Sequence, residues 1–269
     1  MNDYKINKNY EKEILVKTLE NFDKIGEYVV EPGRNEIKRV VIDEKNFCKT
    51  LNIKKFKKPN FISNVIYKYI KGSKAKRSFE YAKRLLKKKI GTPGPIAYFD
   101  KFGKDKRDYY ISEDLKYDFT CREIFWPEDY EKVKEENWYK KIEEKREKVI
   151  RQFAKFSYGL HEKGIYFEDY SPGNVLIVEK SKNYEFYLVD LNRMKFDVKM
   201  NLKSRMKNLS RMMEDEKLAK IFCNEYAKYC KLPEKVVYKN LNKFIKKHKN
   251  YVFIMDLTRP VRRAFKKKK

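Results

Sequence analysis

The sequence predicts an α+β protein in two lobes: a β-rich N-terminal lobe with one main helix, and a mostly helical C-terminal lobe that carries a single hairpin. Strand-like runs rich in Val, Ile and Tyr occupy residues 27–30, 37–42 and 51–56, with turn residues between them. From about residue 130 the apolar residues recur at helical spacing instead. A change from strand to helix period along one chain indicates segregated sheet and helices, which is the α+β class.

The length and composition indicate one folded domain. The chain has 269 residues, of which 41% are hydrophobic and 15% aromatic, enough apolar material for a sizeable core. No Gly/Ser-rich linker and no internal repeat divides it. We therefore expect a single domain over residues 1–269, with an N-terminal lobe of about 1–115 and a C-terminal lobe of about 116–269 that ends in a basic tail.

The main helix of the N-terminal lobe is expected over residues 73–89. Ser73 can accept a hydrogen bond from a backbone N–H of the first turn and is the predicted N-cap. Gly91 and the prolines after it end the helix, and two more strands are expected within residues 91–100 and 107–115. The predicted buried face of the helix carries Ala75, Phe79, Ala82 and Leu86.

The C-terminal lobe contains the strongest helix pattern, residues 142–164, which Gly164 is expected to end. Two short apolar strands follow at residues 174–178 and 186–190, joined by a polar turn. The chain after Leu202 again has mostly helical spacing. The predicted buried stripe of the long helix is Ile142, Val149, Phe153, Phe156 and Leu160.

The charge of the chain is strongly unbalanced, with 66 Lys and Arg against 39 Asp and Glu and a formal net charge of +27. Basic clusters are spread along the whole chain rather than confined to one tail. This balance is typical of a protein with an anionic partner, such as nucleic acid, an acidic membrane surface or a phosphorylated glycolipid. A solvated lysine-rich surface has the same composition, and charge alone does not choose among these interpretations.

The cysteines and the N-terminus bear on the compartment. Cys48, Cys121, Cys223 and Cys230 form no CxxC pair and are too few for a disulfide scaffold. We therefore expect reduced thiols in a cytosolic protein, without a zinc site. The N-terminus lacks the apolar segment of a secretory signal, and no apolar run approaches the about 18 residues of a transmembrane helix. The expectation is a protein that is soluble or peripheral to a membrane.

Three polar residues stand around the predicted hairpin. Asp169 and Asn174 lie in the turn before its first strand, and Asp190 ends its second strand. Phosphoryl transfer needs a carboxylate that takes the proton of the attacking hydroxyl, which suits Asp169, and oxygen ligands for Mg²⁺, which suits Asn174 and Asp190. Turns with Asp and Asn are common. The order of helix, Asp-x4-Asn, hairpin and Asp nevertheless resembles the catalytic loop and metal-binding Asp of the protein-kinase fold.

The strand-like run at residues 51–56 carries two adjacent lysines that suit ATP phosphates. Strand alternation puts Lys54 on one face and Lys55 on the other. Lys54 matches the strand lysine of a kinase, and Lys55 is the alternative because the register is not determined. On the following helix Glu80 is the acid best placed to pair with Lys54, although a glutamate on a lysine-rich helix is also typical of a surface ion pair.

Five segments of the chain can be compared with a known family: GRNEIK, IKKFKKPN, SKAKRSFEYAKRLLKKKIGTPGPIAY, LHEKGIYFEDYSPGNVLI and LVDLNRM. Together they resemble the lipopolysaccharide kinase family of the Kdo/WaaP type, over about residues 33–194. The third segment is the most specific, because ordinary protein kinases do not carry it. The resemblance implies a kinase-fold enzyme that phosphorylates an inner-core sugar from Mg-ATP. Its ATP-site and catalytic positions would be Lys54, Glu80, Asp169, Asn174 and Asp190.

Two further parts of an ATP site are expected in the N-terminal lobe. Only Gly33 stands where a G-x-G-x-x-G loop would cover the phosphates, so we expect Gly33 with Arg34 or Asn35 to take that place. The linker whose backbone meets the adenine base is expected at Glu113 to Leu115.

The chain departs from protein kinases around the catalytic turn. Phe167 and Glu168 replace the His-Arg pair before the catalytic Asp, DLN replaces DFG, and no APE segment follows. Without that Arg we expect no switching by loop phosphorylation, and without the APE segment we expect a small or glycolipid acceptor rather than a peptide. His161 precedes the helix-ending Gly164 and is expected to pack or cap rather than to catalyse.

The function expected from these features is ATP-dependent phosphorylation of a Kdo or heptose hydroxyl in a lipopolysaccharide precursor, with ATP and Mg²⁺ as cofactors. The expected location is peripheral, at the cytoplasmic face of the inner membrane, because an anionic glycolipid and an acidic bilayer both suit the basic surface. The tail at residues 259–269, with Phe265 as an apolar anchor, is expected to bind that bilayer; a solvated terminus is the alternative.

Two other functions remain open. One is a kinase-fold protein whose partner is a protein or a nucleic acid, and the other is a soluble small-molecule phosphotransferase of the aminoglycoside type. The chain has no recognisable RNA- or DNA-binding motif, which argues against nucleic acid.

Overall fold

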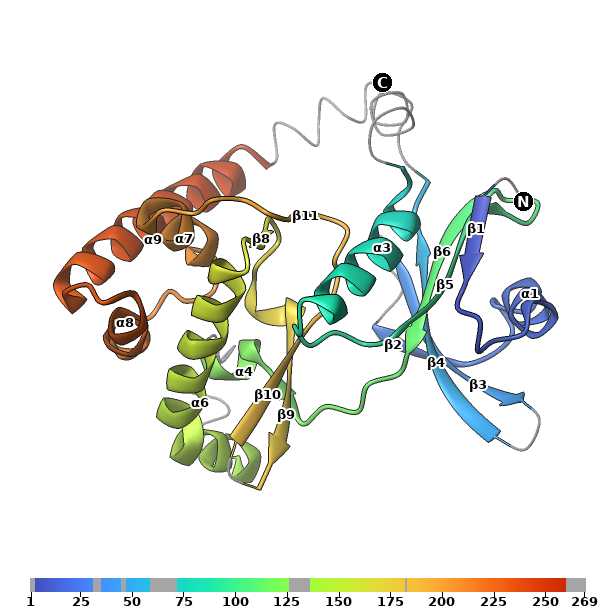
Figure 1. The fold of residues 1–269 in the computed structure, drawn as a ribbon, viewed down its shortest axis with the longest axis horizontal. Coiled ribbons are helices and arrows are strands. Elements are labelled where there is room, and N and C mark those ends of the chain that lie inside the picture. The colour runs from blue at the N-terminus through green and yellow to red at the C-terminus, as the bar shows by residue number, and fades with distance from the viewer. Residues whose placement is uncertain are drawn as a thin grey trace. The chain divides into compact units, whose positions relative to one another are not determined.

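The computed structural model describes residues 3–30, 35–44, 47–58, 72–125, 136–181 and 183–259, and it divides into two compact units (Figure 1). The first unit comprises Met1–Lys116 and Tyr187–Met194, and the second comprises Tyr117–Phe186 and Lys195–Lys269. The inclusion of residues 187–194 in the first unit is not something that the sequence predicted. Sheet dominates the first unit and helices dominate the second, so the predicted α+β class is confirmed.

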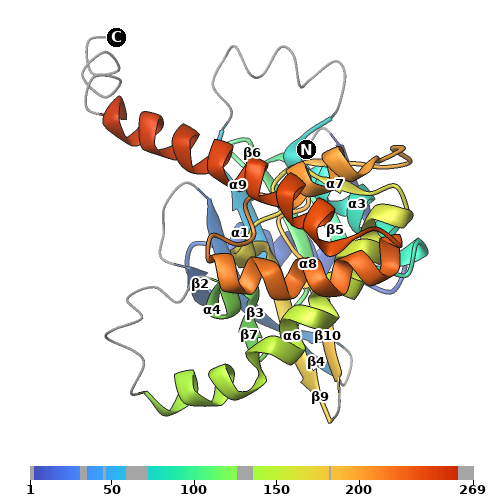
Figure 2. The same cartoon turned by 90° about the vertical axis from the view of Figure 1, so that its left-hand side faces the viewer.

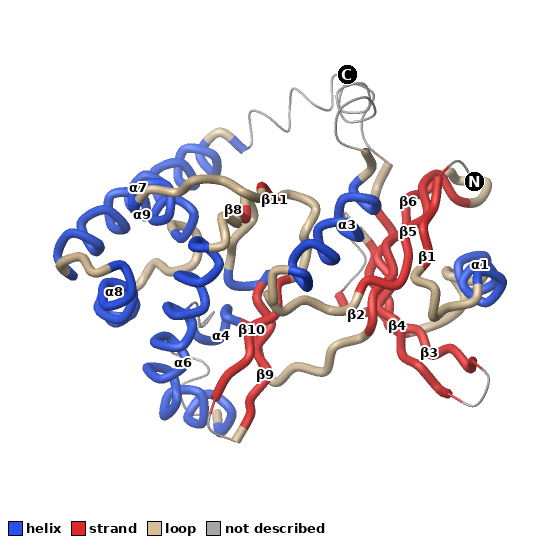
Figure 3. Tube along the Cα trace, viewed as in Figure 1, coloured by secondary structure: helices blue, strands red, loops and turns tan. Residues whose placement is uncertain are grey.

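The first unit is built on one antiparallel sheet (Figure 3), with the strand order β1-β5-β6-β4-β3-β2. Its three predicted N-terminal strands are present as β2, β3 and β4, and the two later ones as β5 and β6. The strands are β1 (Asp3–Ile6), β2 (Glu27–Val30), β3 (Glu36–Glu44), β4 (Phe47–Phe56), β5 (Pro95–Phe102) and β6 (Arg107–Glu113).

Two helices cover opposite faces of this sheet, α1 (Lys12–Glu20) and α3 (Lys74–Lys87) (Figure 1). Successive strand residues point to opposite faces. Ile53 of β4 accordingly packs in one cluster with Leu15 of α1, whereas Phe56 packs in the other cluster with Phe79 of α3. The sheet therefore has an apolar layer on each side.

Helix α3 begins where the sequence predicted. The Ser73 hydroxyl oxygen accepts a hydrogen bond from the Lys76 backbone N–H at 2.9 Å and caps the first turn. The predicted burial of Ala75, Phe79 and Ala82 is confirmed, but that of Leu86 is wrong, because Leu85 is fully buried and Leu86 is 44% exposed.

Helix α6 (Asn137–Glu162) and the hairpin of β9 (Val175–Lys180) and β10 (Asn183–Leu188) follow the predicted order in the second unit. Phe153 of α6 lies at the centre of its core, with ring centroids 5.4–5.9 Å from those of Phe186 and Phe222. Helix α6 packs against α8. The other elements of this part of the chain are β7 (Phe119–Thr120), α4 (Cys121–Phe125), β8 (Tyr166–Phe167), β11 (Met194–Lys195), α7 (Leu202–Leu209), α8 (Glu216–Cys230) and α9 (Glu234–Leu257).

Gly164 ends α6, as the sequence predicted. Its φ is +67°, a left-handed conformation that glycine adopts without strain. An added Cβ would lie 3.1 Å from the backbone of Asp197 and Val198, so the position is also crowded. The chain can therefore turn sharply from α6 into the segment that carries Asp169.

All four cysteines are free. Within the described ranges, no helix is both long enough and apolar enough to cross a membrane.

Candidate active site

The turn that carries Asp169 and Asn174 is held by buried contacts within the second unit. It runs from β8 to the short helix η1 (Pro172–Asn174). The Tyr170 hydroxyl, fully buried, lies 2.8 Å from the Ser157 hydroxyl of α6. The Asn208 side chain donates to the Phe167 carbonyl at 2.6 Å. Anchors on both sides of Asp169 fix the backbone from which its carboxylate projects.

Two hydrogen bonds of the turn involve Asp169. Arg211 Nη1 donates to its Oδ1 at 3.1 Å, and the Asp169 side chain is only 23% exposed. The Asn174 Nδ2 donates to the Asp169 backbone carbonyl at 2.8 Å. Because the amide nitrogen of Asn174 is used in this way, its carbonyl oxygen is the end of the side chain left for a cation.

Glu168, the neighbouring acid, faces a different partner. Its Oε1 lies 2.9 Å from Lys195 Nζ, and both side chains are largely exposed. The two consecutive carboxylates therefore have different environments, and only Asp169 belongs to the hydrogen-bonded turn with Asn174.

In the first unit, Lys54 and Asp190 form an ion pair. Lys54 Nζ donates to Asp190 Oδ1 at 2.8 Å, with the lysine side chain 10% exposed and the aspartate 36% exposed. Asn192 Nδ2 donates to the same oxygen at 2.6 Å. Asp190 has a φ of +57°, a left-handed conformation that Asp and Asn tolerate better than other side chains.

The segment around Asp190 is tied to both ends of α3. At one end, buried Arg77 donates through Nε to the Asn192 carbonyl at 3.0 Å and through Nη1 to the Gly72 carbonyl at 2.6 Å. At the other, buried Thr92 donates to the Leu188 carbonyl at 2.8 Å. The segment singled out in the sequence as most specific therefore positions Asp190, a role that spacing alone did not reveal.

The predicted Lys54–Glu80 ion pair is wrong. Glu80 Oε1 instead lies 3.1 Å from Lys5 Nζ, with side chains 40% and 50% exposed. The reason is the rotation of α3, which turns Ser78 and Leu85 inward and Glu80 outward. The carboxylate beside Lys54 is that of Asp190.

Lys55, the alternative to Lys54, points away from this pair. Its Nζ donates to Asp23 Oδ1 at 2.8 Å and lies 3.6 Å from Glu36 Oε1. Burial alone would lower the pKa of Lys55, but its hydrogen bond to Asp23 and nearby charges raise that pKa overall. Lys55 thus has its own acidic partners on the opposite face of β4.

The other predicted nucleotide contacts are only partly described. Gly33 and Arg34 lie outside the described residues. Glu113 ends β6, and its backbone N–H donates to the Gly94 carbonyl at 2.9 Å; Leu115 follows two residues later and is partly buried.

His161 has the packing role that the sequence predicted. It is 1% exposed, with Nδ1 2.8 Å from the Tyr226 hydroxyl and Nε2 3.3 Å from Asn208 Oδ1. Burial lowers the pKa of His161 to about 3, so the imidazole is neutral at physiological pH. It links α6, α7 and α8.

The oxygen-rich side chains suit Mg²⁺ in their chemistry. Asp190 offers a carboxylate and Asn174 an amide oxygen, both hard ligands that Mg²⁺ prefers. No group of three or more His, Cys, Asp or Glu side chains fit to hold a metal is present among the residues that the structure describes. A magnesium ion bound by either side chain would thus depend on nucleotide phosphates for further ligands, as is usual for kinases.

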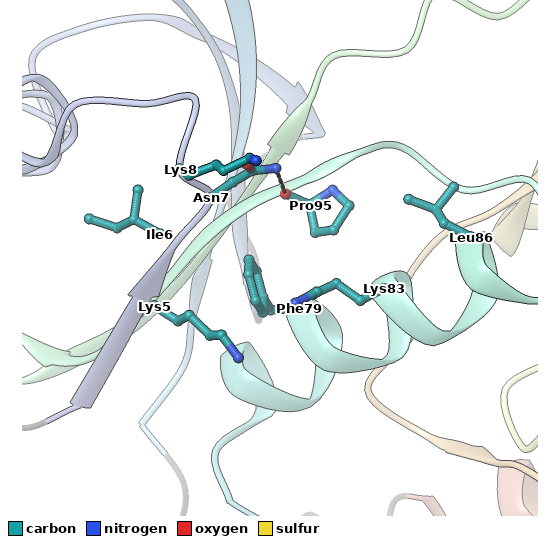
Figure 4. Close-up of a pocket in the computed structure, with 8 residues that line it drawn as sticks. All are labelled: Lys5, Ile6, Asn7, Lys8, Phe79, Lys83, Leu86 and Pro95. Atoms are coloured by element: carbon teal, nitrogen blue, oxygen red, sulfur yellow. Dashed lines mark hydrogen bonds between the residues drawn. The ribbon is translucent and has the colours of Figure 1, made fainter.

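A separate pocket of about 460 Å³ opens on the first unit beside β1 and α3 (Figure 4). Phe79 and Leu86 provide apolar lining, and Lys5 and Lys83 add positive charge. Among the described residues that line it, none belongs to the predicted site. This pocket is therefore distinct from the Lys54–Asp190 pair.

Sequence reasoning missed three residues of the site, Arg77, Asn192 and Arg211. Arg77 contacts a residue 115 positions away, and Arg211 one that is 42 positions away. Of the three, only Asn192 had a local signal in the sequence. It lies two residues after Asp190 in DLN, and Asp side chains commonly form hydrogen bonds two residues further along the chain.

Comparison with known proteins gives a matching family model and similar solved structures. The model of the lipopolysaccharide kinase (Kdo/WaaP) family matches residues 21–247. A solved structure, WaaP in complex with acyl carrier protein, matches with a TM-score of 0.59 at 12% identity, covering 93% of this chain and 97% of that chain. This similarity confirms the predicted two-lobed kinase-like fold.

A second solved structure is more distant. A double mutant of the Mycobacterium tuberculosis PknI kinase domain matches with a TM-score of 0.42 at 12% identity, covering 76% of this chain and 74% of that chain. No curated protein sequence matches the chain.

Proposed function

The chain belongs to the lipopolysaccharide kinase (Kdo/WaaP) family, and from that premise we propose that it transfers the γ-phosphoryl group of ATP to a Kdo or heptose hydroxyl of a lipopolysaccharide precursor. The observation that carries the proposal is the anchored turn in which Asn174 donates to the Asp169 carbonyl at 2.8 Å. This turn holds a carboxylate and an amide oxygen on one short loop, the pair of groups that phosphoryl transfer to a hydroxyl requires.

Asp169 would orient the acceptor hydroxyl and take its proton as the oxygen attacks phosphorus. Arg211 Nη1 donates to Asp169 Oδ1 at 3.1 Å, which helps to hold the carboxylate in one orientation. The anchors at Tyr170 and Phe167 keep the carboxylate in one place, so little motion is needed at the moment of transfer.

The nucleotide would be held through its phosphates and its base. Lys54 would bind the α- and β-phosphates, and the backbone near Glu113 and Leu115 would meet the adenine. Asn174 and Asp190 would hold Mg²⁺, which when bound neutralises charge on the β- and γ-phosphates. Gly33 and Arg34 stay the proposed cover of the phosphates.

The proposed acceptor is an anionic glycolipid at the cytoplasmic face of the inner membrane. The formal net charge of +27 supports an acidic surface as partner, because each Lys or Arg near such a bilayer adds about 1 kcal/mol of attraction. The WaaP structure contains an acyl carrier protein, so a carrier protein is a further candidate partner.

The experiment that tests the proposed function is incubation with Mg-ATP and a panel of lipid A precursors that bear Kdo, heptose or neither, read by mass spectrometry. We expect one added phosphoryl group on a Kdo- or heptose-bearing member and none on the sugar-free control. Phosphorylation of an included aminoglycoside or basic protein, with none on the glycolipids, would favour the alternative functions.

Lys54 and Lys55 are a matched pair for testing which lysine binds phosphate. We expect Lys54→Ala to lower turnover about 100-fold, the scale of losing one charged donor to a transferring group. Lys55→Ala should change it only a few-fold, because Lys55 pairs with Asp23 and Glu36 instead. Steady-state kinetics with varied ATP measures both; equal losses would show that the assignment of Lys54 is wrong.

Arg77 is expected to act as a positioning residue for Asp190. Arg77→Lys cannot keep both of its hydrogen bonds, to the carbonyls of Gly72 and Asn192, so the Asp190 segment should loosen. We expect KM for Mg-ATP to rise about tenfold and to fall back partly at high Mg²⁺. Arg84→Lys, at an exposed position of the same helix, is the control. A lowered melting temperature with an unchanged magnesium dependence would reduce Arg77 to a purely structural role.

A further inference from the structure

Helix α9 packs on its neighbours along only part of its length. Its buried residues are Val237, Leu241 and Ile245, which contact α7 and α8. Figure 2 shows its last turns running out past α8. The segment that projects, residues 251–257, is called the α9 tip below.

The α9 tip is apolar and exposed. Phe253 and Leu257 are 69% and 71% exposed, and Tyr251, Val252 and Ile254 are also exposed. Consecutive helix residues are separated by about 100°, so five successive apolar residues, 251–255, surround the whole circumference. Exposed apolar surface of this extent marks an interaction site rather than an ordinary surface.

The all-round pattern indicates what covers the α9 tip. A helix that docks in a protein groove presents one stripe of anchors and keeps the opposite side polar. The α9 tip has no such polar side, because its one charged residue is Asp256, which pairs with Arg259. Lipid contacts an inserted segment on all sides, so such a segment can be apolar around its whole circumference.

The charge next to the α9 tip is complementary to an acidic lipid surface. Four exposed lysines lie in the eight residues before it, Lys243, Lys246, Lys247 and Lys249, called the lysine collar below. Between residues 234 and 259 the acids are Glu234 and Asp256, against six lysines and one arginine. Lys243, Lys246 and Lys247 can snorkel, with their stems on apolar surface and their ammonium groups at the headgroups. Lys249 donates to the Glu214 carbonyl at 3.2 Å instead.

The length of the α9 tip matches a shallow insertion. Seven residues at 1.5 Å rise span about 10 Å, which is the depth of the headgroup and upper acyl region. As stated above, no described helix is fit to cross a membrane. The geometry is that of an anchor that lies in one leaflet.

We propose that the α9 tip inserts into the headgroup–acyl boundary of an anionic bilayer while the lysine collar contacts the acidic headgroups. The proposal rests on the proposed function in one respect: the glycolipid acceptor resides in the same bilayer, so the anchor raises the local concentration of the substrate. The anchor is part of the described α9 and does not depend on residues 260–269.

Vesicle binding tests the insertion. Phe253→Gln with Leu257→Gln should weaken binding to phosphatidylglycerol-containing vesicles by about 100-fold, roughly tenfold for each buried side chain lost. Val236→Gln, at an exposed apolar position at the start of the same helix, is the matched control and should bind as the parent does. Lys246→Gln with Lys247→Gln should weaken binding at low salt and lose its effect at high salt.

Depth is tested with Phe253→Trp, whose emission should shift to the blue and be quenched by brominated lipids relative to the parent protein. Unshifted tryptophan emission in the vesicle-bound protein would overturn the proposal. So would vesicle binding that is kept in the Phe253/Leu257 double variant but lost when residues 262–269 are deleted. Concentration-dependent dimerisation that the double variant abolishes would assign the α9 tip to a second copy instead.

The same variants separate this proposal from the proposed function. The Phe253/Leu257 double variant should phosphorylate a detergent-dispersed acceptor at the parent rate and lose activity only on vesicle-embedded acceptor. If the parent is inactive on both forms but the vesicle results hold, the kinase function fails and the anchor stands.

Discussion

Replacement of Asp169 by Asn is expected to lower kcat by about 10²–10⁴-fold, the usual contribution of a general base. Asn keeps the size of the side chain and its Oδ1 can still accept from Arg211, so the turn should stay intact. What is lost is the charge that draws the proton from the acceptor hydroxyl. Nucleotide affinity, measured by calorimetry, should stay within a few-fold of the parent.

Glu168→Gln is the control for Asp169→Asn. Glu168 is the adjacent acid, but its partner is the exposed Lys195 at 2.9 Å, and surface pairs of this kind contribute little. Its kcat should therefore be near that of the parent. A larger loss for Glu168→Gln than for Asp169→Asn would mean that the base is wrongly assigned.

Asp190→Asn is expected to weaken magnesium-dependent nucleotide binding by about 100-fold or more, because loss of a direct ligand should cost at least as much as loss of an outer partner. Asn is the suitable replacement, since it tolerates the φ of +57° at this position, whereas Ala would add strain. Asn174→Ala should give a defect of the same kind. Titration of ATP binding against Mg²⁺ concentration measures both, and raised Mg²⁺ should restore part of the affinity.

Asp23→Ala provides the comparison for Asp190→Asn in the same unit. Asp23 pairs with Lys55 at 2.8 Å but its side chain is 73% exposed. We expect its magnesium titration to match the parent. If Asp190→Asn binds Mg-ATP normally, Asp190 is not a metal ligand and its pair with Lys54 is only structural.

Periodicity predicted the elements whose burial follows a single stripe. In α6, Ile142, Val149, Phe153 and Leu160 are buried as expected, whereas Phe156, also predicted for the buried stripe, is only partly buried. In α3 the lysines leave the apolar pattern sparse, and the phase of the helix was not determined by it. The burial of Ala75, Phe79 and Ala82 was still predicted correctly, and the error concerns the end of the stripe, where Leu85 is buried and Leu86 is exposed. Glu80 faces outward because it follows the buried Phe79, and consecutive helix residues are about 100° apart.

Elements stabilised by distant partners were not predicted. Strand β1 has four residues and pairs with β5, more than 90 positions later in the chain, so no local pattern marks it. Helix α1 is similarly short and was missed. Arg211 and Arg77 belong to the same class, because a side chain that reaches a loop from another element has no characteristic spacing in the sequence.

The turn that carries Asp169 and Asn174 and the hairpin before Asp190 could be predicted because these elements are consecutive in the chain. Local order of this kind limits where the side chains lie. The ion-pair partner of Lys54 could not be predicted in this way, because it depends on how α3 packs on the sheet. The sequence favoured Glu80, whereas the structure pairs Lys54 with Asp190 and Glu80 with Lys5.

Transfer of phosphate from ATP labelled at the γ-position is the most direct test of the central claim. The parent protein, Mg²⁺ and a Kdo- or heptose-bearing lipid A precursor should give label in the glycolipid, and EDTA or Asp169→Asn should abolish nearly all of it. Label that appears in the glycolipid at the same rate with Asp169→Asn, or no label with any member of the panel, would contradict the account.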